Sequence, residues 1–322
     1  MGYPLGAPGQ AWRIRHDPFG PDTIDTVTTE PVAAEPSAAP PPPATARAGR
    51  RRAQQQPTRL PATTPGLLAG VVAAALAGLA LLGTAPLGVG VFAVQVVVCL
   101  AWLATLDARG STGAFALGVA ASIACDIVVG VADTPDIGRT ALVVALTVLA
   151  SLIHQLLRRP RRGVTLSIAA TLSMAVFASC GASYVALRVE GGGGIADAAA
   201  LFGAGVALAV ARIVDLVVPR PAVVPGSRRG IVGLLLGLGA AGATGWLYGH
   251  AHGDVLGSDH GVRMAIVTAL IALLADLAVD AVLSTAPPDE ERSVAALTPL
   301  GMLLPVVLSG PAAYVAGRIL LG

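Results

Sequence analysis

The stretch Met264–Ser284, MAIVTALIALLADLAVDAVLS, decides the fold class of this chain. It is apolar and long enough to cross a bilayer, which takes about 20 residues of helix. Two acids, Asp276 and Asp280, interrupt it. They are four residues apart, so a helix carries both on one face. Charges at membrane depth are costly and usually face protein or water. The stretch therefore predicts a transmembrane helix with one polar wall.

The composition of the whole chain agrees with a membrane protein. Of its 322 residues, 54% are hydrophobic and 12% are charged, whereas a soluble chain carries about 25% charged residues. The sequence contains no lysine, which excludes any mechanism that needs one. The three cysteines lie in apolar segments without CxxC or Cys/His spacing, so neither a disulfide framework nor a zinc site is predicted.

Apolar segments of about 20 residues alternate with short polar breaks from Gly66 onward. This pattern predicts an all-α, polytopic helical membrane protein with about nine transmembrane helices over residues 66–322. The predicted spans are Gly66–Gly83, Leu87–Leu106, Gly113–Val131, Thr140–Leu157, Val164–Leu187, Ile195–Val218, Ile231–Tyr248, Met264–Ser284 and Leu300–Leu321.

Residues Met1–Pro65 form a separate region that is rich in proline, alanine and threonine. Its sequence has no apolar periodicity, and such a segment cannot bury enough surface to offset the entropy of ordering it. We therefore expect a disordered tail in front of the membrane domain.

Arginine is concentrated on one side of the predicted topology. Cytoplasmic loops of membrane proteins carry the excess of basic residues, so the tail is expected in the cytoplasm and the C-terminus outside a cell membrane. Basic clusters next to spans also attract anionic lipid headgroups. Membrane lipids are the expected partners, no nucleic-acid partner is expected, and the oligomeric state is not indicated. The predicted lipid contacts are Arg50, Arg51, Arg52, Arg158, Arg159, Arg161 and Arg162.

A second charged pair, Arg212 and Asp215, lies three residues apart on the span Ile195–Val218. With a rise of about 1.5 Å per residue, Arg212 lies about 9 Å and Asp276 about 12 Å from the cytoplasmic ends of their helices. These matching depths predict a polar intramembrane cluster of Arg212, Asp215, Asp276 and Asp280. The cluster is either a structural latch between two helices or a functional polar pocket.

Three further patterns have ordinary interpretations. The GxGxxG match at Gly237–Gly242 lies inside a predicted span, which favours helix packing over nucleotide binding. The histidines and acids of 250–260 are either an ordinary polar loop or ligands of a divalent metal. Ser309-Gly310-Pro311 predicts a kink in the last span.

Two short motifs near the charged cluster resemble the phosphatidate cytidylyltransferase (CDP-diacylglycerol synthase) family. Ala275-Asp276-Leu277 is similar to the family's Gly-Asp-Leu, and Ser227-Arg228-Arg229-Gly230 is similar to its Ser-Pro-Lys-Lys-Thr loop. Asp215 stands where the family has an acid. The resemblance covers at most the sixth span to the C-terminus. It implies a polytopic enzyme that joins CTP to phosphatidic acid, with Asp215, Asp276 and Asp280 on Mg²⁺.

Several of the family's catalytic positions have no counterpart here. Val279 replaces the acid that follows Gly-Asp-Leu, Leu283-Ser284 replaces its Lys-Arg, and Ala295–Pro305 lacks its last signature. We therefore expect a divergent, non-catalytic member with no catalytic residues and no cofactor, Mg²⁺ being implied only if the chain is an enzyme. Two alternatives stay open. One is a lipid-nucleotide transferase of this family, and the other is a small-solute or proton-coupled transporter.

Overall fold

The structure is a computed structural model of the chain. It describes residues 64–106, 111–131, 134, 136–157, 163–223, 229–285 and 291–321, except for the side chains of 111, 283–285 and 291–297. Most of the predicted tail, with Arg50, Arg51 and Arg52, lies outside these residues. The predicted lipid contacts Arg158, Arg159, Arg161 and Arg162 lie outside them as well.

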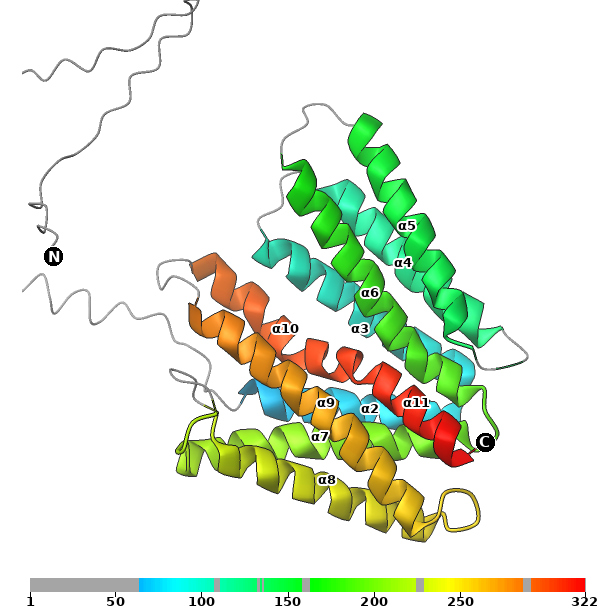
Figure 1. Ribbon diagram of the computed structural model, residues 1–322, viewed down its shortest axis with the longest axis vertical. Coiled ribbons are helices and arrows are strands. Elements are labelled where there is room, and N and C mark those ends of the chain that lie inside the picture. The colour runs from blue at the N-terminus through cyan, green and yellow to red at the C-terminus, as the bar shows by residue number, and fades with distance from the viewer. Residues whose placement is uncertain are drawn as a thin grey trace, which may run out of the picture. The chain divides into compact units, whose positions relative to one another are not determined.

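The described residues fold into helices and contain no strand, which confirms the predicted fold class (Figure 1). Nine helical spans in this part of the chain are long and apolar enough to cross a membrane, with α10 and α11 together forming the last one. The helices are α2 (Thr64–Leu82), α3 (Thr84–Thr105), α4 (Ser111–Gly130), α5 (Gly138–Leu157), α6 (Val164–Arg188), α7 (Gly193–Val217), α8 (Ile231–Ala251), α9 (Ser258–Thr285), α10 (Glu291–Leu308) and α11 (Gly310–Leu321).

The helices pack in two groups. In the first helix group, α2 packs on α7, and α7, α8 and α9 pack on one another. In the second helix group, α3, α4, α5 and α6 pack together. The pair α10–α11 runs between the groups (Figure 1): α10 contacts α3 as well as α9 and α2, and α11 contacts α6 as well as α9.

Small residues let the helices of the first group approach closely. A Cβ at Gly237 of α8 would lie 2.7 Å from the carbonyl oxygen of Ala207 in α7. A Cβ at Gly245 would overlap the carbonyl oxygen of Gly261 in α9. Close backbone contact of this kind is how helices associate in lipid, where apolar side chains gain little by leaving the solvent. The buried stripe of α8 is Gly233, Gly237, Ala241, Gly245 and Gly249.

The last span is broken, as Ser309-Gly310-Pro311 predicts. Helix α10 ends at Leu308 and α11 begins at Gly310, with Ser309 between them. The Tyr184 hydroxyl of α6 is 2.8 Å from the Ser309 hydroxyl and donates to the carbonyl oxygen of Val306 at 3.1 Å. A proline shortly after a break suits a helix start, because its missing N–H would be unpaired there anyway.

Two helix boundaries differ from the expectation by more than three residues. Helix α9 begins at Ser258, so Asp259 and His260 belong to its first turn and not to a loop. Helix α10 begins at Glu291, well before the predicted start of the last span at Leu300. In both cases polar residues extend an apolar helix beyond the membrane-spanning length, which hydropathy alone does not detect.

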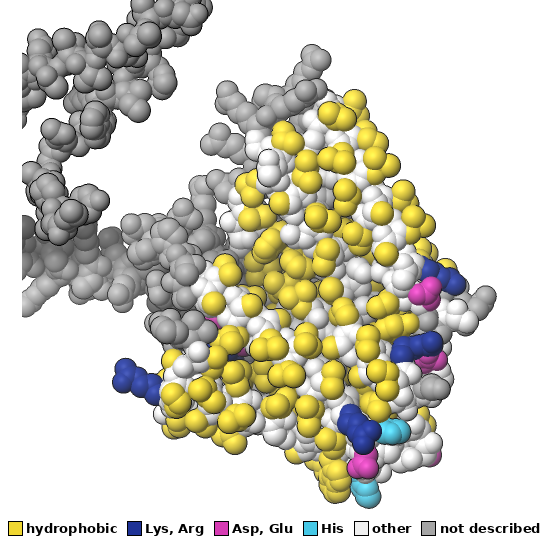
Figure 2. Space-filling view, in the orientation of Figure 1, with side chains coloured by type: hydrophobic (Ala, Val, Ile, Leu, Met, Phe, Trp, Pro, Cys, Tyr) yellow, Lys and Arg dark blue, Asp and Glu magenta, His cyan; other side chains and the backbone are white. Residues whose placement is uncertain are grey.

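The surface of the helices fits contact with lipid. Large apolar side chains such as Leu82, Leu157 and Val217 are mostly exposed. Figure 2 shows hydrophobic side chains spread over the visible helix faces, with charged and histidine side chains at its edges. Such faces are stable only where hydrocarbon or another protein covers them.

Candidate functional site

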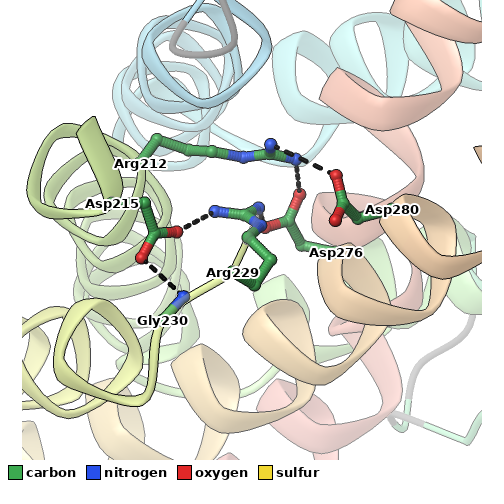
Figure 3. Close-up of polar contacts among 6 residues, drawn as sticks. All are labelled: Arg212, Asp215, Arg229, Gly230, Asp276 and Asp280. Carbon is green, nitrogen blue, oxygen red and sulfur yellow. Dashed lines mark hydrogen bonds and ion pairs between the residues drawn. The ribbon is translucent and has the colours of Figure 1, made fainter. Parts of the chain in front are cut away.

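Five charged residues meet where the C-terminal end of α7, the residues before α8 and the C-terminal half of α9 come together (Figure 3). We call this the ion-pair network, and the end of the domain where it lies the network end. Its members are Arg212, Asp215, Arg229, Asp276 and Asp280.

Arg212 joins α7 to α9. Its Nη2 donates to Oδ1 of Asp276 at 2.6 Å, and its Nη1 lies 3.7 Å from Oδ1 of Asp280. The acids are one turn apart on α9, so one guanidinium reaches both. Gly66 of α2 makes room for this side chain, because a Cβ there would overlap the Arg212 stem. Arg212 is only 9% exposed.

Arg229 joins the segment before α8 to α7 and α9. Its Nη1 donates to Oδ2 of Asp215 at 3.0 Å, and its Nη2 pairs with Oδ2 of Asp276. The backbone N–H of Gly230 donates to the other Asp215 oxygen at 3.0 Å. Asp215 therefore holds both the side chain and the backbone of the segment that leads into α8.

The network carries two arginines and three aspartates, so its formal charge is +2 − 3 = −1. Burial, with the neighbouring charge of Arg212 as the next cause, lowers the pKa of Arg229 to about 10. Arg229 is thus still positive at neutral pH. Asp276 is 2% exposed and faces both arginines. A buried charge is tolerated when it is paired in this way.

The structure brings together all four residues that the sequence singled out and adds a fifth, Arg229. Arg212 contacts Asp276 and Asp280, whereas Asp215 bonds to Arg229 and Gly230. Arg229 is the member that the sequence analysis missed as part of the cluster. The predicted cluster contains one arginine and three acids, whereas the network contains two arginines and three acids. Its signals in the sequence were its position in the basic segment just before α8 and its place in the motif Ser227-Arg228-Arg229-Gly230.

The arrangement of the network is that of ion pairs. Asp215, Asp276 and Asp280 each face an arginine. Among the described residues, no group of three or more His, Cys, Asp or Glu side chains is placed to hold a metal ion. A magnesium site of the kind that the cytidylyltransferase resemblance implies would require these carboxylates to leave their arginines.

Two histidines at the opposite end of the domain, which we call the far end, stack on aromatic rings. The ring of His252 stacks on Tyr248 with centroids 4.4 Å apart, and His250 stacks on Trp246 at 5.4 Å. Asp126 of α4, a further intramembrane acid, accepts a hydrogen bond from Gln95 of α3 at 3.2 Å. It does not belong to the ion-pair network.

Comparison of the chain with protein families, curated proteins and solved structures finds no match. The cytidylyltransferase resemblance accordingly depends on the short sequence motifs alone.

Proposed function

We propose that the chain is a non-catalytic integral membrane protein that moves a small solute or protons across the cell membrane by relative movement of its two helix groups. The observation that carries this proposal is the broken helix between the groups. Helices α10 and α11 contact both groups and separate at Ser309, inside an apolar span.

A broken helix inside a membrane domain frees backbone groups that a continuous helix would satisfy. Such helices occur in transporters at binding sites between structural repeats, near the middle of the bilayer. In this chain the break is next to Tyr184 of α6, in the second helix group. The Tyr184 hydroxyl bonds to the Val306 carbonyl oxygen and lies within hydrogen-bond distance of the Ser309 hydroxyl. A movement of the groups would have to exchange these bonds, which makes the break a natural hinge.

The ion-pair network has a supporting role in this proposal. Its members lie on α7, on α9 and in the segment before α8, all within or next to the first helix group. It would therefore act as a latch that keeps this group rigid while the second group moves. The network is not itself the solute site, since its charges are directed at one another.

The arginine distribution supports a cytoplasmic network end. The basic segments that lead into α2, α6 and α8 all fall on this side when the spans alternate. Contacts with anionic lipid headgroups, worth about 1 kcal/mol each near the surface, are proposed for Arg50, Arg51, Arg52, Arg158, Arg159, Arg161 and Arg162.

Transport is tested first by access to the break. In a background where the three cysteines are replaced, Ser309→Cys should react with a water-soluble thiol reagent that is added to either side of proteoliposomes. Ala73→Cys, buried between α2 and α7, is the control and should stay protected. Protection of Ser309→Cys from both sides would contradict relative movement at the break.

The transported species is sought with uptake assays under an imposed pH gradient, using amino acids, sugars, nucleobases and organic cations. We expect gradient-dependent uptake of one class. Equilibrium dialysis with labelled CTP and magnesium tests the competing enzyme hypothesis. CTP binding that requires Asp276 would overturn the non-catalytic proposal.

A further inference from the structure

A carboxyl group without a hydrogen-bond partner lies at the far end of the first helix group. Asp197, in the second turn of α7, is fully buried. Neither of its carboxylate oxygens has a hydrogen bond. An ionised carboxylate in such a site is very costly unless it is paired. The observed arrangement therefore suits the protonated, neutral acid.

The nearest positive charge is already bonded elsewhere. Arg188, the last residue of α6, donates its Nε–H to the carbonyl oxygen of Ala80 at 2.7 Å. Ala80 is close to the C-terminal end of α2, where carbonyl groups lack partners within the helix. Arg188 also interacts electrostatically with Asp197, although the two do not form an ion pair.

The guanidinium of Arg188 lies over the first turn of α7. A Cβ at Gly194 would be 2.9 Å from Nε and 3.1 Å from Cζ of Arg188. Gly194 and Asp197 are three residues apart, so they share one face of α7. The guanidinium of Arg188 therefore lies against the turn of α7 that precedes Asp197, and glycine at 194 leaves room for it there.

Few other charges face this carboxyl group. Helix α2 contributes no titratable residue. From α6, Tyr184 also interacts electrostatically with Asp197, but its hydroxyl is bonded at Ser309 and Val306. On α11, Arg318 is paired with Glu190. The remaining charged or titratable residues at the far ends of the helices packed on α7 are Tyr248 and His250 of α8, Asp259, His260 and Arg263 of α9, and Tyr314 of α11.

We propose that Asp197 is a proton-binding site and that its charge decides the partner of Arg188. When Asp197 is protonated, Arg188 bonds to the Ala80 carbonyl, as in the structure. When Asp197 releases its proton, the carboxylate draws the guanidinium to itself, and the bond to Ala80 is lost.

The exchange changes a bond between the two helix groups. Arg188 belongs to the second group, and Ala80 and Asp197 belong to α2 and α7 of the first. The proton thus selects which helix of the first group holds α6 at the far end. This role deepens the proposed transport function and rests on it, naming the proton as the coupling species.

The test is infrared spectroscopy of the full chain in lipid, titrated over pH. The wild-type chain should show a protonated-carboxyl C=O band that disappears on alkalinisation and is absent in Asp197→Asn. Arg188→Gln removes the positive charge that favours the ionised form. The band should then persist to a pH that is higher by about 1 to 3 units. Asp126→Asn is the matched control and should leave the titration of the Asp197 band unchanged.

Each outcome is decisive. Wild-type and Asp197→Asn spectra that coincide at every pH would overturn the proton site. A midpoint that Arg188→Gln does not move would overturn the exchange of Arg188. If Asp197→Asn does not fold, Asp197→Glu replaces it and should keep a band at a shifted position. These spectra do not require transport, so an intact band together with a protected Ser309→Cys would contradict the proposed function alone.

Discussion

Replacing the carboxylate of Asp276 in the ion-pair network should destabilise the domain far more than replacing that of Asp280, one turn further along α9. Asp276→Asn and Asp280→Asn each change the formal charge of the network from −1 to 0 and conserve side-chain volume. Any difference in stability between the two variants therefore reflects their contacts and burial and not the net charge of the network. The two residues share the same helix and the same partner, Arg212.

The expected losses of unfolding free energy in the two variants follow from the contacts of Asp276 and Asp280. Asp276 is 2% exposed, lies 2.6 Å from Arg212 and also pairs with Arg229. Breaking a buried pair by removing one partner costs about 3–5 kcal/mol, so we expect a loss in this range. Asp280 has a side chain that is 19% exposed and lies 3.7 Å from Arg212. A partly exposed pair of this length contributes about 1 kcal/mol or less.

The assay is denaturant unfolding of the full chain in mixed micelles, followed by the fluorescence of Trp102 and Trp246. A double-mutant cycle on Arg212→Ala and Asp276→Ala supplies the coupling energy directly, expected within the range of about 0.5–3 kcal/mol for residues in contact. Equal losses in Asp276→Asn and Asp280→Asn, or a coupling of zero between folded variants, would refute the latch.

Two further changes test packing and topology. Gly245→Ala should destabilise the domain by about 1–3 kcal/mol, because the added methyl group overpacks against Gly261. Gly239→Ala on the same helix, where a Cβ meets open space, should instead stabilise it by up to about 1 kcal/mol through higher helix propensity. If the thermal midpoints of the two variants fall in the opposite order, α8 does not pack through its glycine stripe. A cysteine at Ser227, in a chain without other cysteines, should react with an impermeant thiol reagent only from the cytoplasmic side, and labelling from outside intact cells would reverse the proposed orientation.

The sequence predicts the helices well because length and hydropathy are local properties. A span such as Val164–Leu187 needs only its own residues to be recognised, and α6 matches it within one residue. The kink at Ser309-Gly310-Pro311 is equally local. The two acids of Met264–Ser284 were found because a charge inside an apolar segment is conspicuous.

The grouping of the helices could not be predicted in the same way. Helix α2 packs on α7 although four helices separate them in the chain. Nearly all faces of these spans consist of Ala, Gly, Val and Leu, so no pattern distinguishes one partner from another. Arg229 was missed for a related reason, because it lies between spans, and no periodicity connects it to Asp215.

The pairing of α2 with α7 also has a consequence for biosynthesis. Helix α2 leaves the ribosome before the second group, α3 to α6, but it packs on α7, which is made only after that whole group. Arg212 in turn is made 64 residues before Asp276. At about 5–20 residues per second of translation, it waits about 3 to 13 s for that partner. During this interval α7 enters the membrane with an arginine whose counter-charge on α9 does not yet exist.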